Sequence, residues 1–244
     1  MAGGAMIELV PIRYGGGDDV ELTGYLADGS KGRPAPGVLV AHEGGGLGRH
    51  TKERARRLGE LGYVAFALDY YGQEDPPLER AMALGKALRG DRPLFRKRLG
   101  AGLDVLLARA EVDPLRLAGI GYCMGGAAVI ELARMGAPFV AVAGFHSGFV
   151  PASPEENAAI GGKLLLCHGA DDPIVGPVQR DAFLAEASAA GVDWQLHLYG
   201  GVGHSFTNPD IDALGLPGFA YDETADRRSW AAMLNLFEEV LELR

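Results

Sequence analysis

The residue best suited to covalent chemistry is Cys123, which stands in the run G-Y-C-M-G-G at 121–126. A short apolar run at 117–120 comes directly before it, and an alanine-rich segment of helical character follows. A nucleophile between glycines at such a strand-to-helix turn forms a nucleophile elbow, because only small residues fit beside the strained central residue. The helix N-terminus at this turn carries partial positive charge, which favours the thiolate. The pattern therefore predicts that Cys123 is a nucleophile.

A thiol nucleophile works with a base and with a carboxylate that orients the base. Where a nucleophile elbow is used, the acid and then the histidine follow it along the chain. An apolar run at 163–167 leads into H-G-A-D-D-P-I-V, which holds Asp171 and Asp172. Asp172 stands directly before proline in a G-x-x-D-x-x-V spacing, so we predict that it is the acid. Asp171 stays an alternative, as does the interpretation that both carboxylates only form a turn or cap a helix.

The predicted base is His204, in the run G-G-V-G-H-S-F at 200–206. It follows the last strand-like run, 194–199, and among the six histidines it alone stands in a glycine-rich loop after that run. Such a loop can bring an imidazole to a nucleophile at the same edge of a sheet. The sequence thus predicts a triad of Cys123, His204 and Asp172.

The other histidines and the second cysteine receive structural interpretations. His50, near a helix start, and His197, on a strand face, are interpreted as structural or solvated, and His168 as packed at a strand end. Cys167 lies inside an apolar run and is interpreted as an inert core thiol. His146 follows another apolar run, and two interpretations stay open for it: a pocket-lining residue or a structural one.

Acyl transfer also requires hydrogen-bond donors for the oxyanion. The first predicted donor is the N–H of Met124, the residue after the nucleophile. The second is the N–H of Gly44, in the run H-E-G-G-G-L that directly follows the apolar run 37–41. Glu43 in the same loop supplies a carboxylate that could accept the hydrogen bond of the thiol at rest and move when substrate binds.

The hydrophobic pattern predicts the elements that position these residues. Short continuous apolar runs are typical of strands buried on both faces of a parallel sheet, and they occur at 37–41, 63–68, 117–120, 139–143 and 163–167. Helical spacing occurs at 51–61, 127–135, 178–190 and 224–243. This alternation predicts an α/β fold with a doubly wound, mostly parallel sheet and helices on both faces.

Three further expectations concern chain organisation. Residues 20–27 alternate between apolar and polar positions and follow a turn at 15–19, which predicts an N-terminal antiparallel hairpin with 6–14. Segment 72–110 is longer than one crossover helix requires, so we expect two helices broken near 90–93, as a candidate insertion over the active-site edge. No repeat or linker interrupts the sequence, which predicts a single domain over 1–244.

Composition excludes several classes of protein. The 244 residues carry a net charge of −9, which argues against nucleic acid or an anionic membrane as a partner. The arginine-rich stretches 49–57 and 89–98 are interrupted by acidic residues and are expected to be solvated. Two cysteines are too few for a disulfide framework. With no export signal and no apolar stretch of the ~20 residues that a bilayer requires, we expect a soluble, cytoplasmic protein.

Four ordered motifs, G-Y-C-M-G-G, A-D-D-P-I-V, G-H-S-F and A-H-E-G-G-G, resemble the dienelactone hydrolase (carboxymethylenebutenolidase-like) family of α/β-hydrolases. The resemblance implies hydrolysis of a small ester or lactone through a Cys-His-Asp triad and an acyl-enzyme. It implies no metal or other cofactor, and a monomer or weak homodimer. It further implies that Glu43 contacts the resting thiol and that Tyr71 lines the substrate pocket, which we expect to include Tyr122, His146 and Asn208.

One position departs from the family pattern. Members that take a dienelactone carboxylate carry an arginine four residues after the histidine, whereas this chain has Asn208 there. The place of a clamp for an anionic substrate is thus taken by a neutral amide, and dienelactone is not predicted as the substrate. Alternatives on the same scaffold are an acyltransferase or thioesterase, a redox-sensing cysteine protein and a silent ligand-binding module. The intact triad argues against the last, and the lack of a C-x-x-C pair against redox sensing.

Overall fold

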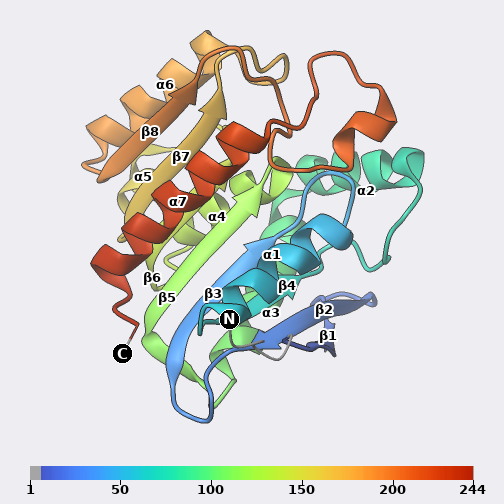
Figure 1. Cartoon of the computed structure of the whole chain (residues 1–244), viewed down its shortest axis with the longest axis vertical. Coiled ribbons are helices and arrows are strands. Elements are labelled where there is room, and N and C mark those ends of the chain that lie inside the picture. Colours follow the sequence, from blue (N-terminus) through green and yellow to red (C-terminus); the bar gives the residue numbers. More distant parts are fainter. Residues whose placement is uncertain (1–6, 244) are drawn as a thin grey trace. The chain divides into compact units, whose positions relative to one another are not determined.

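The computed structural model describes residues 7–243. The chain forms two compact units, one built mainly from the residues up to Ala118 and the other from Gly119 to Glu242. Each unit is described by itself below. The strands of the sheet follow the order β1-β2-β4-β3-β5-β6-β7-β8, which confirms the predicted doubly wound α/β fold (Figure 1).

The first unit begins with the predicted hairpin. Strands β1 (Leu9–Gly15) and β2 (Glu21–Asp28) pair antiparallel, and β2 also pairs antiparallel with β4 (Val64–Leu68). Strand β3 (Ala35–Ala41) pairs parallel with β4, and both strands are buried along their whole length, as their apolar runs predict. Met6, the first residue of the predicted hairpin, lies outside the described residues.

Helices cover both faces of these strands. Helix α1 (Arg49–Glu60) packs on β2, β3 and β4 and lies in front of them in Figure 1, whereas α3 (Arg92–Leu107) lies behind. The expected break in the 72–110 segment is confirmed, because α2 (Leu78–Gly90) ends where α3 begins. The break is fixed at Asp91, whose carboxylate accepts a hydrogen bond of 3.0 Å from the N–H of Leu94 and so caps α3.

The second unit contains parallel strands. It begins within strand β5 (Val112–Tyr122), whose residues up to Ala118 belong to the first unit, and its strands β6 (Phe139–Phe145), β7 (Lys163–Gly169) and β8 (Trp194–Tyr199) pair in parallel in that order. Chemistry-bearing segments follow the carboxyl ends of these strands. Cys123 comes directly after β5, where α/β folds place their ligands.

Helices of the second unit also lie on both faces. Helix α7 (Glu223–Val240) packs on β6 and β7 and crosses in front of them in Figure 1, whereas α4 (Met124–Arg134) lies behind. Helix α6 (Pro177–Ala189) was predicted from its sequence pattern. The five-residue α5 (Pro154–Ala158) and the 3₁₀ turn η1 (Ile211–Leu214) were not, because elements this short show no hydrophobic period.

The expectation that both arginine-rich stretches are solvated is wrong at two positions. Arg54 is 4% exposed and donates to His50 Nε2 at 3.2 Å. Arg98 is 6% exposed, donates to the Tyr70 carbonyl at 3.0 Å and pairs with Asp18 at 2.6 Å. Both side chains bury their aliphatic stems where fixed acceptors meet the guanidinium group, which a count of charges along the chain does not reveal.

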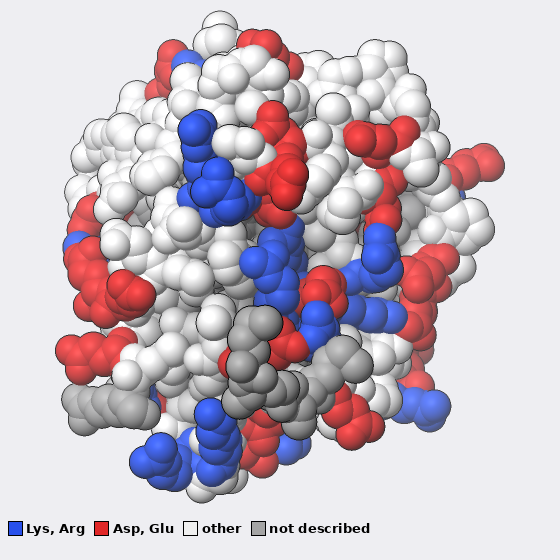
Figure 2. All heavy atoms as spheres, viewed as in Figure 1, with Lys and Arg blue, Asp and Glu red and all other residues white. Residues whose placement is uncertain are grey.

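The visible surface has no large area of one charge sign: Figure 2 shows basic side chains interspersed with acidic ones. Arg56 on α1, for example, pairs with Glu53 and Glu60. Within residues 7–243, no helix is both long enough and apolar enough to cross a membrane.

Candidate active site

Cys123 has the strained backbone that the elbow motif predicts. Its φ of 52° and ψ of −114° place a residue with a side chain in a region that such residues rarely adopt. Backbone hydrogen bonds hold it there. The Cys123 N–H donates to the Phe145 carbonyl at 2.9 Å, and the Cys123 carbonyl accepts from the N–H groups of Gly126 and Gly148 at 3.1 and 3.2 Å. The side chain is partly exposed.

Gly121 allows the elbow to close. A Cβ atom on this residue would overlap the carbonyl oxygen of Gly125 and the nitrogen of Gly126, which are backbone atoms that cannot turn away. The chain therefore requires glycine here for steric reasons. Met124 follows the nucleophile as the first residue of α4, so its N–H belongs to the first turn of a helix.

The structure joins Asp172, and not Asp171, to His204. The Nδ1 atom of His204 lies 2.7 Å from Asp172 Oδ2, and the two residues are 1% and 6% exposed. The other carboxylate oxygen of Asp172 accepts from the N–H groups of Ile174 and Val175 at 2.8 and 3.0 Å. Asp171 is exposed. The acid is thus fixed by its own loop, and a buried carboxylate orients the imidazole.

The electrostatics connect all three residues. Burial lowers the pKa of His204, but the hydrogen bond to Asp172 and the interaction with Cys123 outweigh it and raise the pKa to about 10. Burial raises the pKa of Asp172, but the hydrogen bond from His204 and the backbone donors leave it below its usual value. Since Nδ1 is bonded to Asp172, the interaction with the Cys123 sulfur falls to Nε2, for which no other hydrogen-bond partner is found within residues 7–243.

Two further histidines lie beside this pair. The ring of His146 is fully buried, packs edge-on against His204 with centroids 5.2 Å apart, and has its Nε2 2.9 Å from Thr207 Oγ1. His168, 1% exposed, has its Nε2 3.0 Å from the Val175 carbonyl and 3.8 Å from Asp172 Oδ2. His168 therefore packs at its strand end as expected, and His146 lies against the predicted base.

Two residues predicted for the substrate pocket have other contacts. Tyr122 is fully buried, and its ring stacks on Phe145 with centroids 4.8 Å apart. Asn208 is half-buried, and its side-chain oxygen accepts from the N–H of Asp210 at 3.0 Å while its own N–H donates to Ser205. Asn208 thus shapes the turn that leads from His204 into η1. The pocket roles of both residues stay predictions.

The remaining predicted residues belong to the first unit. A Cβ atom on Gly44 would meet nothing within 4 Å, and the Gly44 carbonyl accepts a hydrogen bond from the Tyr71 hydroxyl at 3.0 Å. The Glu43 carboxylate, mostly buried, lies 3.7 Å from His50 Nδ1. The expected roles of Gly44, Glu43 and Tyr71 in catalysis stay predictions. Sequence reasoning missed His42, whose ring bonds the Glu43 carbonyl at 2.7 Å.

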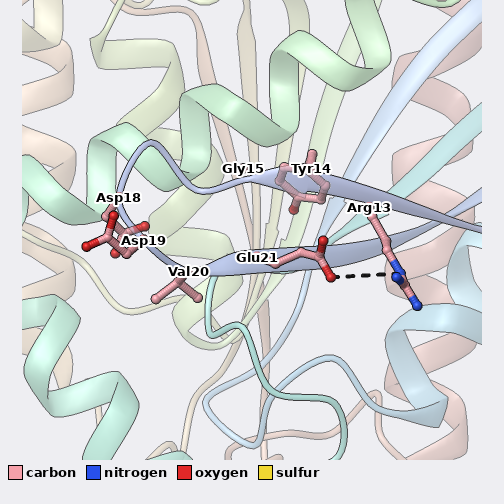
Figure 3. Close-up of a pocket in the computed structure, with 7 residues that line it drawn as sticks. All are labelled: Arg13, Tyr14, Gly15, Asp18, Asp19, Val20 and Glu21. Atoms are coloured by element: carbon pink, nitrogen blue, oxygen red, sulfur yellow. Dashed lines mark ion pairs between the residues drawn. The ribbon is translucent and has the colours of Figure 1, made fainter.

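Neither of two pockets in the structure is lined by a predicted catalytic residue. The first has a volume of about 420 Å³ and lies on the β1–β2 hairpin, where Arg13 and Glu21 form an ion pair of 3.8 Å (Figure 3). The second, about 460 Å³, lies in the second unit, between Phe149 and the start of α6. Within the described part of the chain, no cluster of three or more His, Cys, Asp or Glu side chains could hold a metal ion.

Comparison with known proteins places the chain in a family. The sequence model of the dienelactone hydrolase family matches residues 22–241. A solved structure named m3DLH is 43% identical, has a TM-score of 0.92, and covers 98% of this chain and all of its own. The dienelactone hydrolase-like promiscuous phosphotriesterase P91 from metagenomic libraries is 40% identical with a TM-score of 0.92, over 97% of this chain and 99% of that one. The carboxymethylenebutenolidase of Pseudomonas putida is 26% identical over 202 residues, 77% of this chain and 82% of the relative. The chain therefore belongs to the dienelactone hydrolase family and is a hydrolase with the α/β-hydrolase fold.

Proposed function

We propose that the protein hydrolyses a small ester or lactone through a triad of Cys123, His204 and Asp172, by way of an acyl-enzyme. The observation that supports this most directly is the 2.7 Å separation of His204 Nδ1 and Asp172 Oδ2 in a buried pair. The raised pKa of His204, to which Asp172 and Cys123 both contribute, agrees with it. An imidazole bonded at one nitrogen to a buried carboxylate and facing a thiol at the other is the arrangement of a nucleophile, a base and an orienting acid.

In the first step, His204 holds the proton of the Cys123 thiol, and the sulfur attacks the carbonyl carbon. A C–S bond forms, and the carbonyl π electrons move to oxygen. The N–H groups of Met124 and Gly44 are proposed to stabilise this oxyanion. When the oxyanion collapses, the bond to the leaving oxygen breaks, and the imidazolium of His204 donates its proton to that oxygen. In a lactone the released alcohol stays attached to the acyl group.

In the second step His204 must act as a base. Acylation of Cys123 makes this possible, because it lowers the pKa of His204. Part of the rise in the pKa of His204 comes from Cys123. Once the sulfur carries an acyl group it has no negative charge, so its contribution to the pKa of His204 is lost, and the imidazole can accept a proton from water. The hydroxide adds to the thioester carbonyl, the C–S bond breaks, and the proton returns from His204 to the leaving sulfur or stays in the ion pair.

The substrate class follows from the family and from one position. The neutral Asn208 bonds the Asp210 backbone and supplies no positive charge for a substrate carboxylate. We therefore propose neutral esters and lactones as better substrates than those that carry a carboxylate. A matched panel tests this: lactones with and without a carboxylate, p-nitrophenyl acetate, a thioester and a neutral phosphotriester, the last because one similar protein is described as a phosphotriesterase. Product analysis with an added alcohol separates hydrolysis from acyl transfer.

The test of the proposed function is Cys123→Ala, with Cys167→Ala as its matched control. Cys167 is 1% exposed and burial raises the pKa of its thiol to about 12, so it is not expected to act as a nucleophile. Hydrolysis of p-nitrophenyl acetate should disappear in the first variant and persist in the second. Retained activity in Cys123→Ala would refute the assignment.

A further inference from the structure

Three consecutive backbone carbonyls in the loop after β3 each accept a hydrogen bond from an aromatic side chain. The Tyr70 hydroxyl donates to the His42 carbonyl at 2.5 Å. The Nδ1 atom of His42 lies 2.7 Å from the Glu43 carbonyl oxygen, and the Tyr71 hydroxyl donates to the Gly44 carbonyl at 3.0 Å. All these residues lie in the first unit. A surface loop of glycines would otherwise be free to change conformation.

His42 can act only as a donor toward the Glu43 carbonyl. A carbonyl oxygen cannot donate, so Nδ1 must carry the hydrogen. The ring is fully buried and stacks on Tyr70 with centroids 3.6 Å apart. Burial lowers the pKa of His42 to about 3, with the Glu43 carbonyl acting weakly in the other direction. The ring is therefore neutral near pH 7, and the bond to the Glu43 carbonyl holds it in a single tautomer.

The bond from His42 determines where the Gly44 N–H points. In a trans peptide the carbonyl of one residue and the N–H of the next point in opposite directions, and the described chain contains no cis peptide. Fixing the Glu43 carbonyl therefore fixes the Gly44 N–H. The same carbonyl also accepts from the Gly46 N–H at 3.1 Å, so both of its lone pairs are used. Within residues 7–243, no acceptor is found for the Gly44 N–H itself.

The Tyr71 hydroxyl holds the other side of the same residue, and Tyr71 is itself fixed. Its N–H donates to Asp69 Oδ1 at 2.7 Å, and the N–H of Gly72 donates to the same oxygen at 3.1 Å. The side chain is 3% exposed. The turn after β4 thus supports the loop after β3, and Gly44 is restrained through the carbonyls on both of its peptide bonds.

We propose that His42 and Tyr71 are positioning residues that aim the Gly44 N–H at the oxyanion. The inference rests on the proposed function, in which Gly44 is the second oxyanion donor. An oxyanion donor stabilises the transition state only if it is oriented before the charge develops. In this chain two side chains supply that orientation from outside the glycine loop. Tyr71 then contributes to the rate through the backbone, in addition to any contact with substrate.

Tyr71→Phe tests the proposal with the smallest change, because it removes one hydroxyl and keeps the ring. We expect kcat to fall about five- to tenfold with KM nearly unchanged, since one restraining hydrogen bond is lost and not the donor itself. His42→Leu should lower kcat further, and His42→Asn, whose amide can donate from nearly the same place as Nδ1, should recover part of the loss. Tyr25→Phe is the control. It removes a tyrosine hydroxyl of the same unit that bonds the Glu74 carboxylate and not the loop after β3, and it should keep the wild-type kcat.

Turnover of a thionoester distinguishes a misoriented Gly44 N–H from general damage to the active site. Sulfur in place of the carbonyl oxygen gains little from N–H donors, so the ratio of ester to thionoester turnover should fall in Tyr71→Phe and His42→Leu and stay wild-type in Tyr25→Phe. The rate of Cys123 alkylation by iodoacetamide, which forms no oxyanion, should be the same in all. If turnover depends on Cys123 but the ratio is unchanged in Tyr71→Phe, the inference is wrong while the proposed function stands. If turnover does not depend on Cys123, the proposed function itself fails.

Discussion

His204 Nδ1 and Asp172 Oδ2 lie 2.7 Å apart in a region where both residues are almost wholly buried. A hydrogen bond between an imidazole and a carboxylate at this distance fixes which nitrogen carries the proton toward the acid. It leaves Nε2 for the nucleophile. The bond thus assigns the two nitrogens of His204 different tasks.

Asp172→Asn should lower kcat by about 10²- to 10⁴-fold, because the amide cannot stabilise the imidazolium and favours the wrong tautomer. The matched control is Asp171→Asn, one residue earlier, where the carboxylate is exposed and has no part in the bond to His204. Steady-state hydrolysis of an activated ester measures both. Equal losses in the two variants would contradict the assignment of the acid.

The alkaline limit of activity should lie near pH 10. Donation of a proton to the leaving group requires protonated His204, whose pKa in the free enzyme is about 10. We therefore expect kcat/KM to hold through neutral pH and fall as pH rises through that value. Because Asp172 raises the pKa of His204, the fall should move to lower pH in Asp172→Asn. A pH profile of kcat/KM, corrected for spontaneous hydrolysis, checks both; an unmoved limit would show that another group controls it.

Acid stability should depend on the same carboxylate. The pKa of Asp172 is lower in the folded protein than the ~3.9 of an unperturbed aspartate, so its ionisation stabilises the fold above that value. This contribution is lost as pH falls through the folded-state pKa. Thermal unfolding between about pH 6 and pH 2 should show a steeper loss of stability in the wild type than in Asp172→Asn. Parallel curves would indicate that Asp172 is not ionised in the fold.

Gly121→Ala should destabilise the protein and displace the nucleophile. The added methyl group would overlap backbone atoms of Gly125 and Gly126, so the turn must open, at a cost of about 1–3 kcal/mol. Gly161→Ala is the control, because a Cβ there meets nothing within 4 Å. Denaturant unfolding and the rate of Cys123 alkylation report the two effects. Wild-type values of both in Gly121→Ala would refute the steric explanation of this glycine.

Much of the fold could be predicted because buried parallel strands appear in the sequence as continuous apolar runs. Strand β5 shows the limit of that signal. It begins at Val112, five residues before the run at 117–120, and its first part includes Pro114 and the 81% exposed Leu115. Hydrogen bonding, and not burial, extends the strand there. Hydropathy alone cannot detect such a segment.

The candidate site likewise contains residues that could be predicted from sequence and others that could not. Cys123 and His204 stand in local glycine motifs, so the sequence around each residue indicates its role. The choice between Asp171 and Asp172 needed the structure, since the spacing favours one but only geometry joins it to His204. The packing of His42 and His146 could not be found from sequence, because it depends on residues distant in the chain, the Tyr70 ring in one case and the Thr207 hydroxyl in the other.

The backbone of Cys123 has a consequence for how the protein loses function. No short peptide would keep a non-glycine residue at φ 52° and ψ −114°, so the conformation exists only while β6, through Phe145, and the start of α4 are in place. The elbow geometry is then a property of the folded second unit and not of the G-Y-C-M-G-G sequence. It should be lost in the same cooperative transition that melts the strands, even though unfolding leaves the thiol itself intact and more exposed to solvent.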